Sequence, residues 1–447
     1  MQNIDSTAVN APVRPMGNGH TAEQVSQSLL DRAMVSFLRW DGEKLAWAIL
    51  LLVTVLSRTI GLGDRAMSHD ESLHTVYSLK LFDGEGYRHD PMMHGPLKFH
   101  LTALAYFLFG VNDWSSRIEV AVFGIIMVWL AWLLRPWIGK VGAFLVGLMF
   151  AISPALLFHS RYIRDEVMLC ALLVLLTITV FRYLETRNVR WLYGTAVTLA
   201  LAFTTMEASF IFGGVFGAFL IVAFAAELWR AAWPVAARRY PFRLAVAAAG
   251  PLLAAGVCFF VLMTVAPGAT IGGQAAAPGA AVTSGTAGTN VFFLLGVLCA
   301  GAGLVAALVA TVLAFSTWGL KRLRVFPELD LVVLLITLVL PFLAGVVITA
   351  LSKLHVIGWK VDQFTTATVL TPGMVGVAGA VLAALFALSI LAGYYWLRNT
   401  WVYAAGIFWS ITLLLFTTFL TNGMGIITGL IGSLGYWLAQ QEVARGS

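Results

Sequence analysis

Long apolar stretches constrain this chain more than any other feature. They recur along the 447 residues, and a stretch of about 17 to 25 such residues is long enough to cross the hydrocarbon core of a bilayer as an α-helix. A lipid-exposed segment must satisfy its own backbone hydrogen bonds, which favours helices. Charged residues make up only 11% of the chain, against about 25% in an ordinary soluble domain. The sequence therefore predicts an all-α, polytopic transmembrane bundle.

About 11 spans are expected. The candidate spans are residues 45–62, 118–134, 141–158, 167–184, 191–206, 208–229, 244–265, 291–313, 329–350, 373–396 and 401–421. Several of the connectors between them are basic, with Arg135 and Lys140 in one, Arg182, Arg187 and Arg190 in a second, Arg230, Arg238, Arg239 and Arg243 in a third, and Lys321, Arg322 and Arg324 in a fourth. Short basic loops stay in the cytoplasm. The protein is predicted to be a multi-pass protein of the cell membrane with a cytoplasmic N-terminus, and its net charge of +6 is assigned to these loops rather than to a nucleic-acid surface.

Three segments are expected along the chain. Residues 1–44 are polar and form a cytoplasmic N-terminal segment, in which 24–40 is compatible with an amphipathic helix. Residues 45–230 form a transmembrane module of catalytic type that includes an outer loop at 63–117, and residues 231–447 form a C-terminal bundle. The apolar stretch 96–110 is expected to lie along the outer interface, because a crossing there would put the next basic loop outside.

Two pairs of adjacent carboxylates fall on the predicted outer side. Asp70 and Glu71 follow the first span, and Asp165 and Glu166 lie between two spans with almost no loop. Charges at membrane depth cost about 2.5 to 3.5 kcal/mol each on insertion scales, so they are usually paired or functional. A structural role explains each pair taken alone: Asp70 as a helix N-cap, and the second pair as an interfacial ion cluster at a helix N-terminus. Their common side favours a shared site.

Basic and polar side chains accompany these carboxylates on the same predicted side. The candidates for substrate binding are His69, His94, Lys98, Arg161, Arg164, Glu207, Lys353 and His355. A carboxylate can act as general base on an acceptor hydroxyl, while cationic side chains or a carboxylate-held divalent cation stabilise a departing phosphate. The chain has no fingerprint for a water-soluble nucleotide. A donor from the bilayer is therefore expected.

Several motifs resemble those of the GT-C superfamily of membrane glycosyltransferases, which includes the protein O-mannosyltransferases and the aminoarabinose transferases. These motifs are "HGPLKFH", "FGVNDWSSRI" and "SRYIRDE". The stretches "HDESLHTVYSLKLF", "FTTMEASFIF" and "TNGMGIITGLIGSLGYWLAQQEVARG" more narrowly resemble the flippase-activity-associated membrane protein family of archaea and bacteria. The chain stops soon after the last motif, where relatives are expected to continue, and the sequence leaves open whether it is a complete or a shortened form.

The resemblance implies roles for individual residues. It implies a polyprenyl-phosphate-linked sugar as donor, with Asp70 or Glu71 as catalytic base or metal ligand. Asp165 or Glu166 would position the acceptor or a metal, so that a Mg or Mn ion would be held by Asp70 and Asp165. Lys98 and Arg161 or Arg164 would contact the donor phosphate. Next to Glu207, Met206 stands where a lysine is expected.

The sequence leaves three classes of function open. The first is a glycosyltransferase that acts on the extracytoplasmic side. The second is a flippase or transport component that binds the same lipid-linked sugar without transferring it. The third is a scaffold subunit, for which the small-residue pairs Gly213 with Gly217 and Gly425 with Gly429 would allow close helix packing.

Overall fold

The computed structural model describes residues 41–265, 270–271, 289–366 and 368–440. The amphipathic helix expected over 24–40 and the end of the chain from residue 441 lie outside these residues. The regular secondary structure of the described part is helical, apart from one short antiparallel pairing between β1 and β2, which confirms the predicted all-α class. The chain divides into residues 1–49 and residues 50–447. The arrangement given below is that within residues 50–447, and the predicted boundary near residue 230 stays a prediction.

The first group of elements runs from the N-terminal span to the third basic connector. It consists of α2 (Gly42–Thr59), α3 (His69–Phe82), η1 (Pro91–Met93), α4 (Leu97–Phe109), α5 (Ile118–Trp132), α6 (Arg135–Ile152), α7 (Pro154–His159), α8 (Glu166–Thr186), α9 (Val189–Phe203) and α10 (Ala208–Arg230).

The second group completes the described chain. It consists of α11 (Ala236–Val265), β1 (Thr270–Ile271), β2 (Thr289–Asn290), α12 (Val291–Leu323), α13 (Pro327–Val339), η2 (Leu340–Leu343), α14 (Ala344–Lys353), η3 (Val361–Gln363), α15 (Pro372–Leu397), α16 (Asn399–Phe416), α17 (Gly425–Ile427), η4 (Thr428–Gly432) and α18 (Ser433–Gln440).

Eight helical segments of the described chain are long and apolar enough to cross a membrane, so the protein is a multi-pass membrane protein. The expected count of about 11 is not confirmed. Two of the expected spans, 118–134 and 191–206, correspond to α5 and α9, which are shorter apolar helices. The first expected span corresponds to α2, which includes Glu43, Lys44 and Arg58 among its 18 residues.

The span expected at 141–158 is displaced toward the N-terminus. The structure has α6 over Arg135–Ile152 and then a break at Ser153, whose φ of −56° and ψ of 120° lie outside the helical region. Proline disfavours the helical conformation of the residue before it, and Pro154 begins the separate short helix α7. The Ser153 hydroxyl accepts a hydrogen bond from the Leu156 amide and caps α7.

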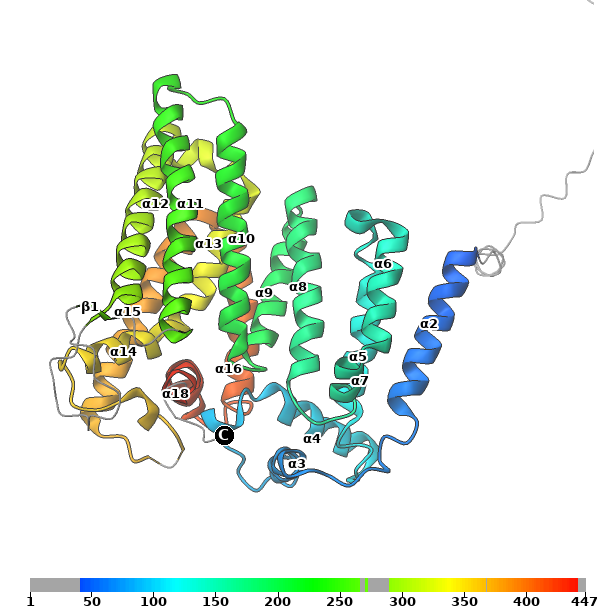
Figure 1. Ribbon diagram of the computed structural model, residues 1–447. Coiled ribbons are helices and arrows are strands. Elements are labelled where there is room, and N and C mark those ends of the chain that lie inside the picture. Colours follow the sequence, from blue (N-terminus) through cyan, green and yellow to red (C-terminus); the bar gives the residue numbers. More distant parts are fainter. Residues whose placement is uncertain (1–40, 266–269, 272–288, 367, 441–447) are drawn as a thin grey trace, which may run out of the picture. The chain divides into compact units, whose positions relative to one another are not determined.

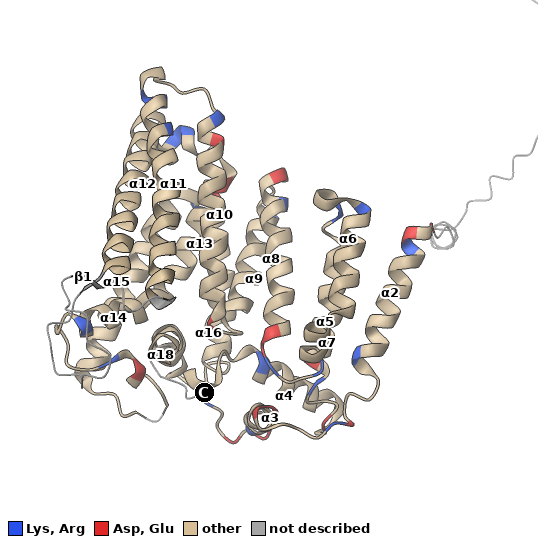
Figure 2. Cartoon of the chain, viewed as in Figure 1, with Lys and Arg blue, Asp and Glu red and all other residues tan. Residues whose placement is uncertain are grey.

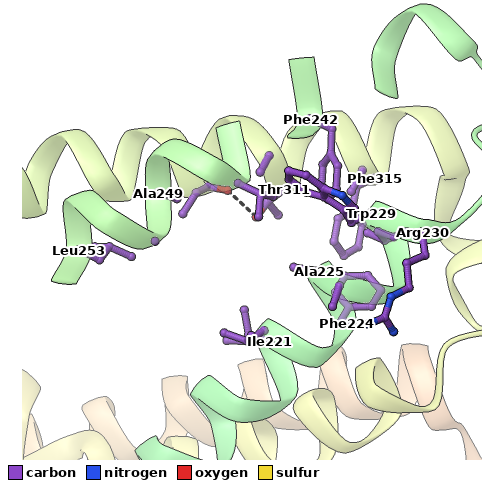
Figure 3. A pocket seen from close by; sticks show the side chains of 18 residues that line it. Ile221, Phe224, Ala225, Trp229, Arg230, Phe242, Ala249, Leu253, Thr311 and Phe315 are labelled. Carbon is purple, nitrogen blue, oxygen red and sulfur yellow. Dashed lines mark hydrogen bonds between the residues drawn. The ribbon is translucent and has the colours of Figure 1, made fainter. Parts of the chain in front are cut away.

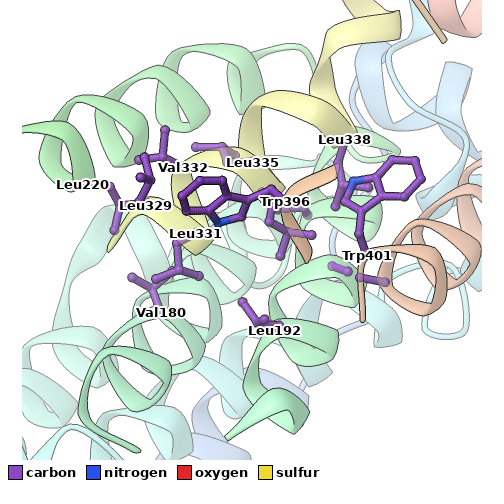
Figure 4. Packing of buried hydrophobic residues seen from close by; sticks show 14 of the residues in the cluster. Val180, Leu192, Leu220, Leu329, Leu331, Val332, Leu335, Leu338, Trp396 and Trp401 are labelled. Carbon is purple, nitrogen blue, oxygen red and sulfur yellow. The ribbon is translucent and has the colours of Figure 1, made fainter. Parts of the chain in front are cut away.

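A large apolar core joins the C-terminal helices to α8 and α9. Leu334 and Leu338 of α13 and Phe408 of α16 are fully buried in it, and Figure 4 shows part of this packing around Trp396 and Trp401. The indole of Trp401 donates a hydrogen bond of 2.8 Å to the Thr337 hydroxyl, so its polar atom is satisfied within the core.

The helices α3 and α4 lie at one end of the long helices. Figure 1 shows α3 seen almost down its axis while α8 and α10 run up the page, so α3 runs across their direction. The helices α3 and α4 pack against each other, and α4 also packs against α5. The stretch expected to lie along the interface, 96–110, forms the short helix α4. Its position relative to a bilayer stays a prediction.

One close backbone contact fixes the start of α4. The Gly95 amide donates a hydrogen bond of 2.9 Å to the Thr205 carbonyl. The Leu97 amide donates one of the same length to the Thr204 carbonyl, and both acceptors lie just after α9. A Cβ atom at Gly95 would collide with the Thr204 carbonyl group, so only glycine fits. This contact anchors the residues on both sides, His94 and Lys98, to the core.

Candidate active site

Charged residues gather at both ends of the long helices (Figure 2). At one end they come from α3, α4 and the loop that leads into α8, and acidic and basic residues are mixed there. The structure brings the two predicted outer loops together at this end. The Ile163 amide donates to the Glu71 carboxylate at 3.4 Å, across a sequence separation of 92 residues.

Glu71 is a fully buried carboxylate held by two guanidinium groups and by the backbone amides of Ser68 and Ile163. Arg117 donates to both of its oxygens, at 3.0 and 3.3 Å, and Arg65 donates to Oε1 at 2.8 Å. The Ser68 amide donates to Oε2, and the Ser68 hydroxyl accepts from the Glu71 amide, which completes a capping box for α3. The helix N-cap is therefore Ser68, so the alternative structural role of Asp70 as a helix cap is wrong.

The surroundings of Glu71 favour its charged form. Burial alone would raise the pKa of its carboxyl, but the hydrogen bonds from Arg117 and Ser68 and the charges of Arg117 and Arg65 bring that pKa below its ordinary value. Arg117 also donates to the carbonyls of Leu62 and Arg65, at 3.0 Å each. This carboxylate–guanidinium pair thus ties together the loop before α3, the start of α5 and the loop before α8.

Asp70 has a different environment although it is the adjacent residue. Its side chain is 46% exposed and accepts a hydrogen bond of 2.7 Å from Nη1 of Arg164. The other terminal nitrogen of Arg164 lies 3.1 Å from Glu166, whose second oxygen lies 3.7 Å from His159. The Nε of Arg164 is buried and has no hydrogen-bond partner among the described residues. One accessible carboxylate and one incompletely satisfied guanidinium therefore lie side by side.

Lys98 and Asp165 form a buried ion pair near the partly exposed side chains of Arg164 and Glu166. Their Nζ and Oδ2 atoms are 2.8 Å apart, and the two side chains are 0% and 1% exposed. The other oxygen of Asp165 is buried without a hydrogen-bond partner among the described residues. Glu119 of α5 is also buried and accepts a bond of 2.9 Å from Thr102. Unsatisfied buried polar atoms are rare in native proteins and indicate a functional or strained site.

His94 and Glu207 make a second pair at the ends of their segments. The Nδ1 atom of His94 lies 2.7 Å from the Glu207 carboxylate at the start of α10. Burial would lower the pKa of His94, but the hydrogen bond and charge of Glu207 raise it above its ordinary value. His94 also has a φ of +65°, a conformation that is uncommon for a residue with a side chain. The close contact at Gly95 holds this backbone in place.

Several important residues at this end are not among the predicted site residues. Arg117 holds Glu71, and Tyr162 shares a hydrogen bond of 2.8 Å with Ser68. His74 is buried with an unpartnered Nδ1; burial, reinforced by the charge of Lys98, lowers its pKa to about 2, so the ring is neutral. The S-x-x-E spacing of Ser68 and Glu71 is a readable capping signal. No spacing rule links Arg117 to a carboxylate 46 residues away.

The other predicted site residues either lie away from the ion pairs described above or donate hydrogen bonds to backbone carbonyls. Arg161 donates to the carbonyls of Ser57 and Gly61, at 2.7 and 2.9 Å, which fixes the end of α2. His69 is exposed at the first turn of α3. Lys353 ends α14 and His355 follows it, and α14 packs mainly on α15, α18 and nearby short helices. The structure does not bring these two residues into the cluster around Asp70.

The donor set for the expected divalent ion is incomplete. Asp70 is paired with Arg164 and Asp165 with Lys98, and no group of three His, Cys, Asp or Glu side chains suited to a metal occurs among the described residues. Magnesium and manganese favour sites rich in oxygen ligands. As arranged here, these residues do not fit a resident ion, and the Mg or Mn site stays a prediction.

Comparison with known proteins supports a membrane glycosyltransferase of the GT-C type. The family model described as dolichyl-phosphate-mannose-protein mannosyltransferase matches residues 93–249, which is about a third of the chain. The chain is similar to this family. The match includes Lys98, Asp165 and Glu207 but begins after Asp70 and Glu71. Together with the helical architecture, it supports the resemblance to GT-C membrane glycosyltransferases. No curated protein matches the chain.

Solved structures give weaker likenesses. The archaeal oligosaccharyltransferase AglB from Archaeoglobus fulgidus, in complex with an inhibitory peptide and a dolichol-phosphate, is 17% identical with a TM-score of 0.38; 91% of this chain and 52% of that chain are covered. ArnT from Cupriavidus metallidurans in the apo state is 15% identical with a TM-score of 0.36, over 90% of this chain and 78% of that chain. The chain thus spans about half the length of AglB. These TM-scores are too low to establish a shared fold.

Proposed function

We propose that this protein is a membrane glycosyltransferase that transfers a sugar from a polyprenyl-phosphate-linked donor to an acceptor hydroxyl on the extracytoplasmic side. The observation that carries the proposal is the contrast between Asp70 and Glu71. Of the two adjacent carboxylates, Glu71 is enclosed by cations and amides, whereas Asp70 is 46% exposed beside a single guanidinium. Asp70 is therefore the carboxylate that a substrate can reach.

In the proposed reaction, Asp70 acts as general base. Its carboxylate takes the proton of the acceptor hydroxyl while the acceptor oxygen bonds to the anomeric carbon of the sugar. The bond between that carbon and the phosphate oxygen breaks, and its electron pair stays on the oxygen, which releases polyprenyl phosphate. Displacement from the opposite face makes inversion at the anomeric carbon the expected outcome.

Arg164 is the cation proposed to meet the departing phosphate. Its guanidinium is 28% exposed and has a free Nε, and its planar fork suits phosphate oxygens. Lys98 is proposed to hold Asp165 through their buried ion pair and so to fix the loop that carries Arg164. Glu166, which shares Arg164 with Asp70, is proposed to keep the guanidinium oriented between binding events. The imidazolium form of His94, favoured by Glu207, adds a further donor.

The test compares two conservative variants of one helix. Purified protein in vesicles is incubated with undecaprenyl-phosphate-linked mannose, glucose or aminoarabinose, and the release of undecaprenyl phosphate is measured. Asp70→Asn is expected to lower the rate by about 10²- to 10⁴-fold, the usual contribution of a general base. Asp83→Asn is the matched control, because Asp83 is exposed at the other end of α3, and it is expected to transfer normally.

Two outcomes would count against the proposal. Near-normal release by Asp70→Asn would remove Asp70 from the reaction. Movement of a labelled lipid-linked sugar between leaflets by the wild-type protein, without release of lipid phosphate, would favour the flippase alternative. The narrower likeness to the flippase-activity-associated family stays a prediction.

A further inference from the structure

A cavity lies between α10, α11 and α12, away from the site around Asp70. Its volume is about 670 Å³, within the range of about 300 to 1,000 Å³ that is usual for small-molecule sites. Figure 3 shows the lining, with Leu253 toward one end and Trp229 and Arg230 toward the other. Between them the wall is made of small and apolar side chains, among them Ala225, Ala249 and Ile221. The groove suits a hydrocarbon chain.

Arginines lie near one end of this groove. Arg230 belongs to its lining, and Arg243 lies against the lining residue Trp229, with its guanidinium 5.2 Å from the indole ring and a hydrogen bond of 2.7 Å to the backbone carbonyl. Arg239 precedes Arg243 by one helical turn on α11 and so shares its face. Figure 2 shows basic residues at the corresponding ends of α10, α11 and α12.

These arginines have fewer acidic partners than their number requires. Arg230 lies 3.3 Å from Glu227. Among the described residues, no carboxylate lies within ion-pair distance of Arg238, Arg239 or Arg243. The Nε atoms of Arg239 and Arg243 are buried and without hydrogen-bond partners in the same part of the chain. Arg243, one of these two residues, lies against the lining residue Trp229, so an unsatisfied cation stands beside the apolar groove. This arrangement suits an anion attached to an apolar body.

We propose that this groove binds one anionic phospholipid from the leaflet that faces the basic end. One acyl chain lies in the groove against Ala225 and Ala249, and the phosphate accepts hydrogen bonds from Arg239 and Arg243. Basic pockets between transmembrane helices recognise anionic lipid headgroups in this way. The groove has its cations at the opposite end of α10 from Glu207 and the reaction site, so a membrane phospholipid fits it better than the lipid-linked donor does. The inference stands independently of the proposed transferase activity.

The test measures lipid retention by native mass spectrometry. The full-length protein is purified in detergent and mixed with palmitoyl-oleoyl phosphatidylglycerol or with the matching phosphatidylcholine. One phosphatidylglycerol is expected to remain bound, at least tenfold more tightly than phosphatidylcholine. Arg239→Gln/Arg243→Gln is expected to lose at least tenfold in this retention. The control Arg187→Gln/Arg190→Gln also removes two basic residues, one at the C-cap of α8 and one in the first turn of α9, and is expected to retain the lipid.

A second variant tests the groove itself. Ala225→Phe fills the apolar passage without changing any charge, and it is expected to weaken phosphatidylglycerol retention by at least tenfold while the unfolding temperature stays within a few degrees. Normal retention by Ala225→Phe or by Arg239→Gln/Arg243→Gln would overturn the proposal. Tighter retention of undecaprenyl phosphate than of phosphatidylglycerol, lost in the same variants, would overturn the assignment of the occupant.

Discussion

The two ends of the long helices differ in how far their charged residues are paired with residues of opposite charge. Around α3, α4 and the start of α8, carboxylates and cations meet in pairs such as Glu71 with Arg117 and Lys98 with Asp165. Where α10 meets α11, arginines outnumber their acidic partners beside an apolar groove. The paired end holds a fixed arrangement around the partly exposed carboxylate of Asp70, as a reaction centre requires. The end where α10 meets α11 has an excess of positive charge, as an anion-binding site requires.

The largest effect on stability is expected at the centre of the paired end. Glu71→Gln leaves Arg117 buried without its anion, and breaking a buried pair costs about 3 to 5 kcal/mol. Asp70→Asn removes only a partly exposed pair, which is worth about 0 to 1 kcal/mol after screening by water. Chemical unfolding in detergent micelles measures both. Equal destabilisation by the two variants would remove the structural distinction between these neighbouring carboxylates.

The Lys98–Asp165 pair is expected to behave as one unit. Lys98→Met leaves the Asp165 carboxylate buried and unpaired and should also lower the free energy of unfolding by about 3 to 5 kcal/mol. The double variant Lys98→Met/Asp165→Leu removes both charges, so most of that loss should be recovered. A double-mutant cycle measures the coupling. Additive losses would show that the two side chains do not depend on each other.

A smaller steric effect is expected where the loop meets α9. Gly95→Ala forces a Cβ atom against the Thr204 carbonyl, and overpacking of this kind costs about 1 to 3 kcal/mol. Gly84→Ala is the matched control, since its Cβ would meet no atom within 4 Å although its φ is +73°. Both variants are compared by thermal unfolding. A smaller loss at Gly95 than at Gly84 would contradict the close contact.

The smallest effect concerns pH and the pair of His94 with Glu207. Because the folded state raises the pKa of His94, the pair stabilises the fold fully below the unfolded pKa of about 6.5 and loses this contribution as the pH rises through the folded value. The unfolding temperature of Glu207→Gln should therefore lie furthest below that of the wild type at acidic pH. A gap that is constant from pH 5 to 9 would rule out this linkage.

The sequence was sufficient to predict the convergence of the two outer loops. The basic loops and the length of the apolar runs determine which connectors share a side, and this places Asp70 and Asp165 at one end of the bundle. The resemblance of "SRYIRDE" and "HGPLKFH" to known motifs points to the same residues. These signals are local in the chain or depend on length alone, so they need no knowledge of packing.

The partners within the site could not be predicted in the same way. Whether Asp70 or Glu71 turns inward depends on the capping box at Ser68 and on Arg117, and the second of these contacts is set by tertiary packing alone. Helix ends such as Ile152 depend on the single proline that follows Ser153. The apolar groove arises from how α10, α11 and α12 fit together, which hydropathy does not encode.

The most direct test is a structure of the protein with undecaprenyl phosphate in lipid nanodiscs. We expect the phosphate to lie within hydrogen-bond distance of Arg164, with the Asp70 carboxylate open toward the adjacent space. A phosphate bound only at Arg239 and Arg243, at the other end of the long helices, would contradict the assignment of the paired end as the reaction centre.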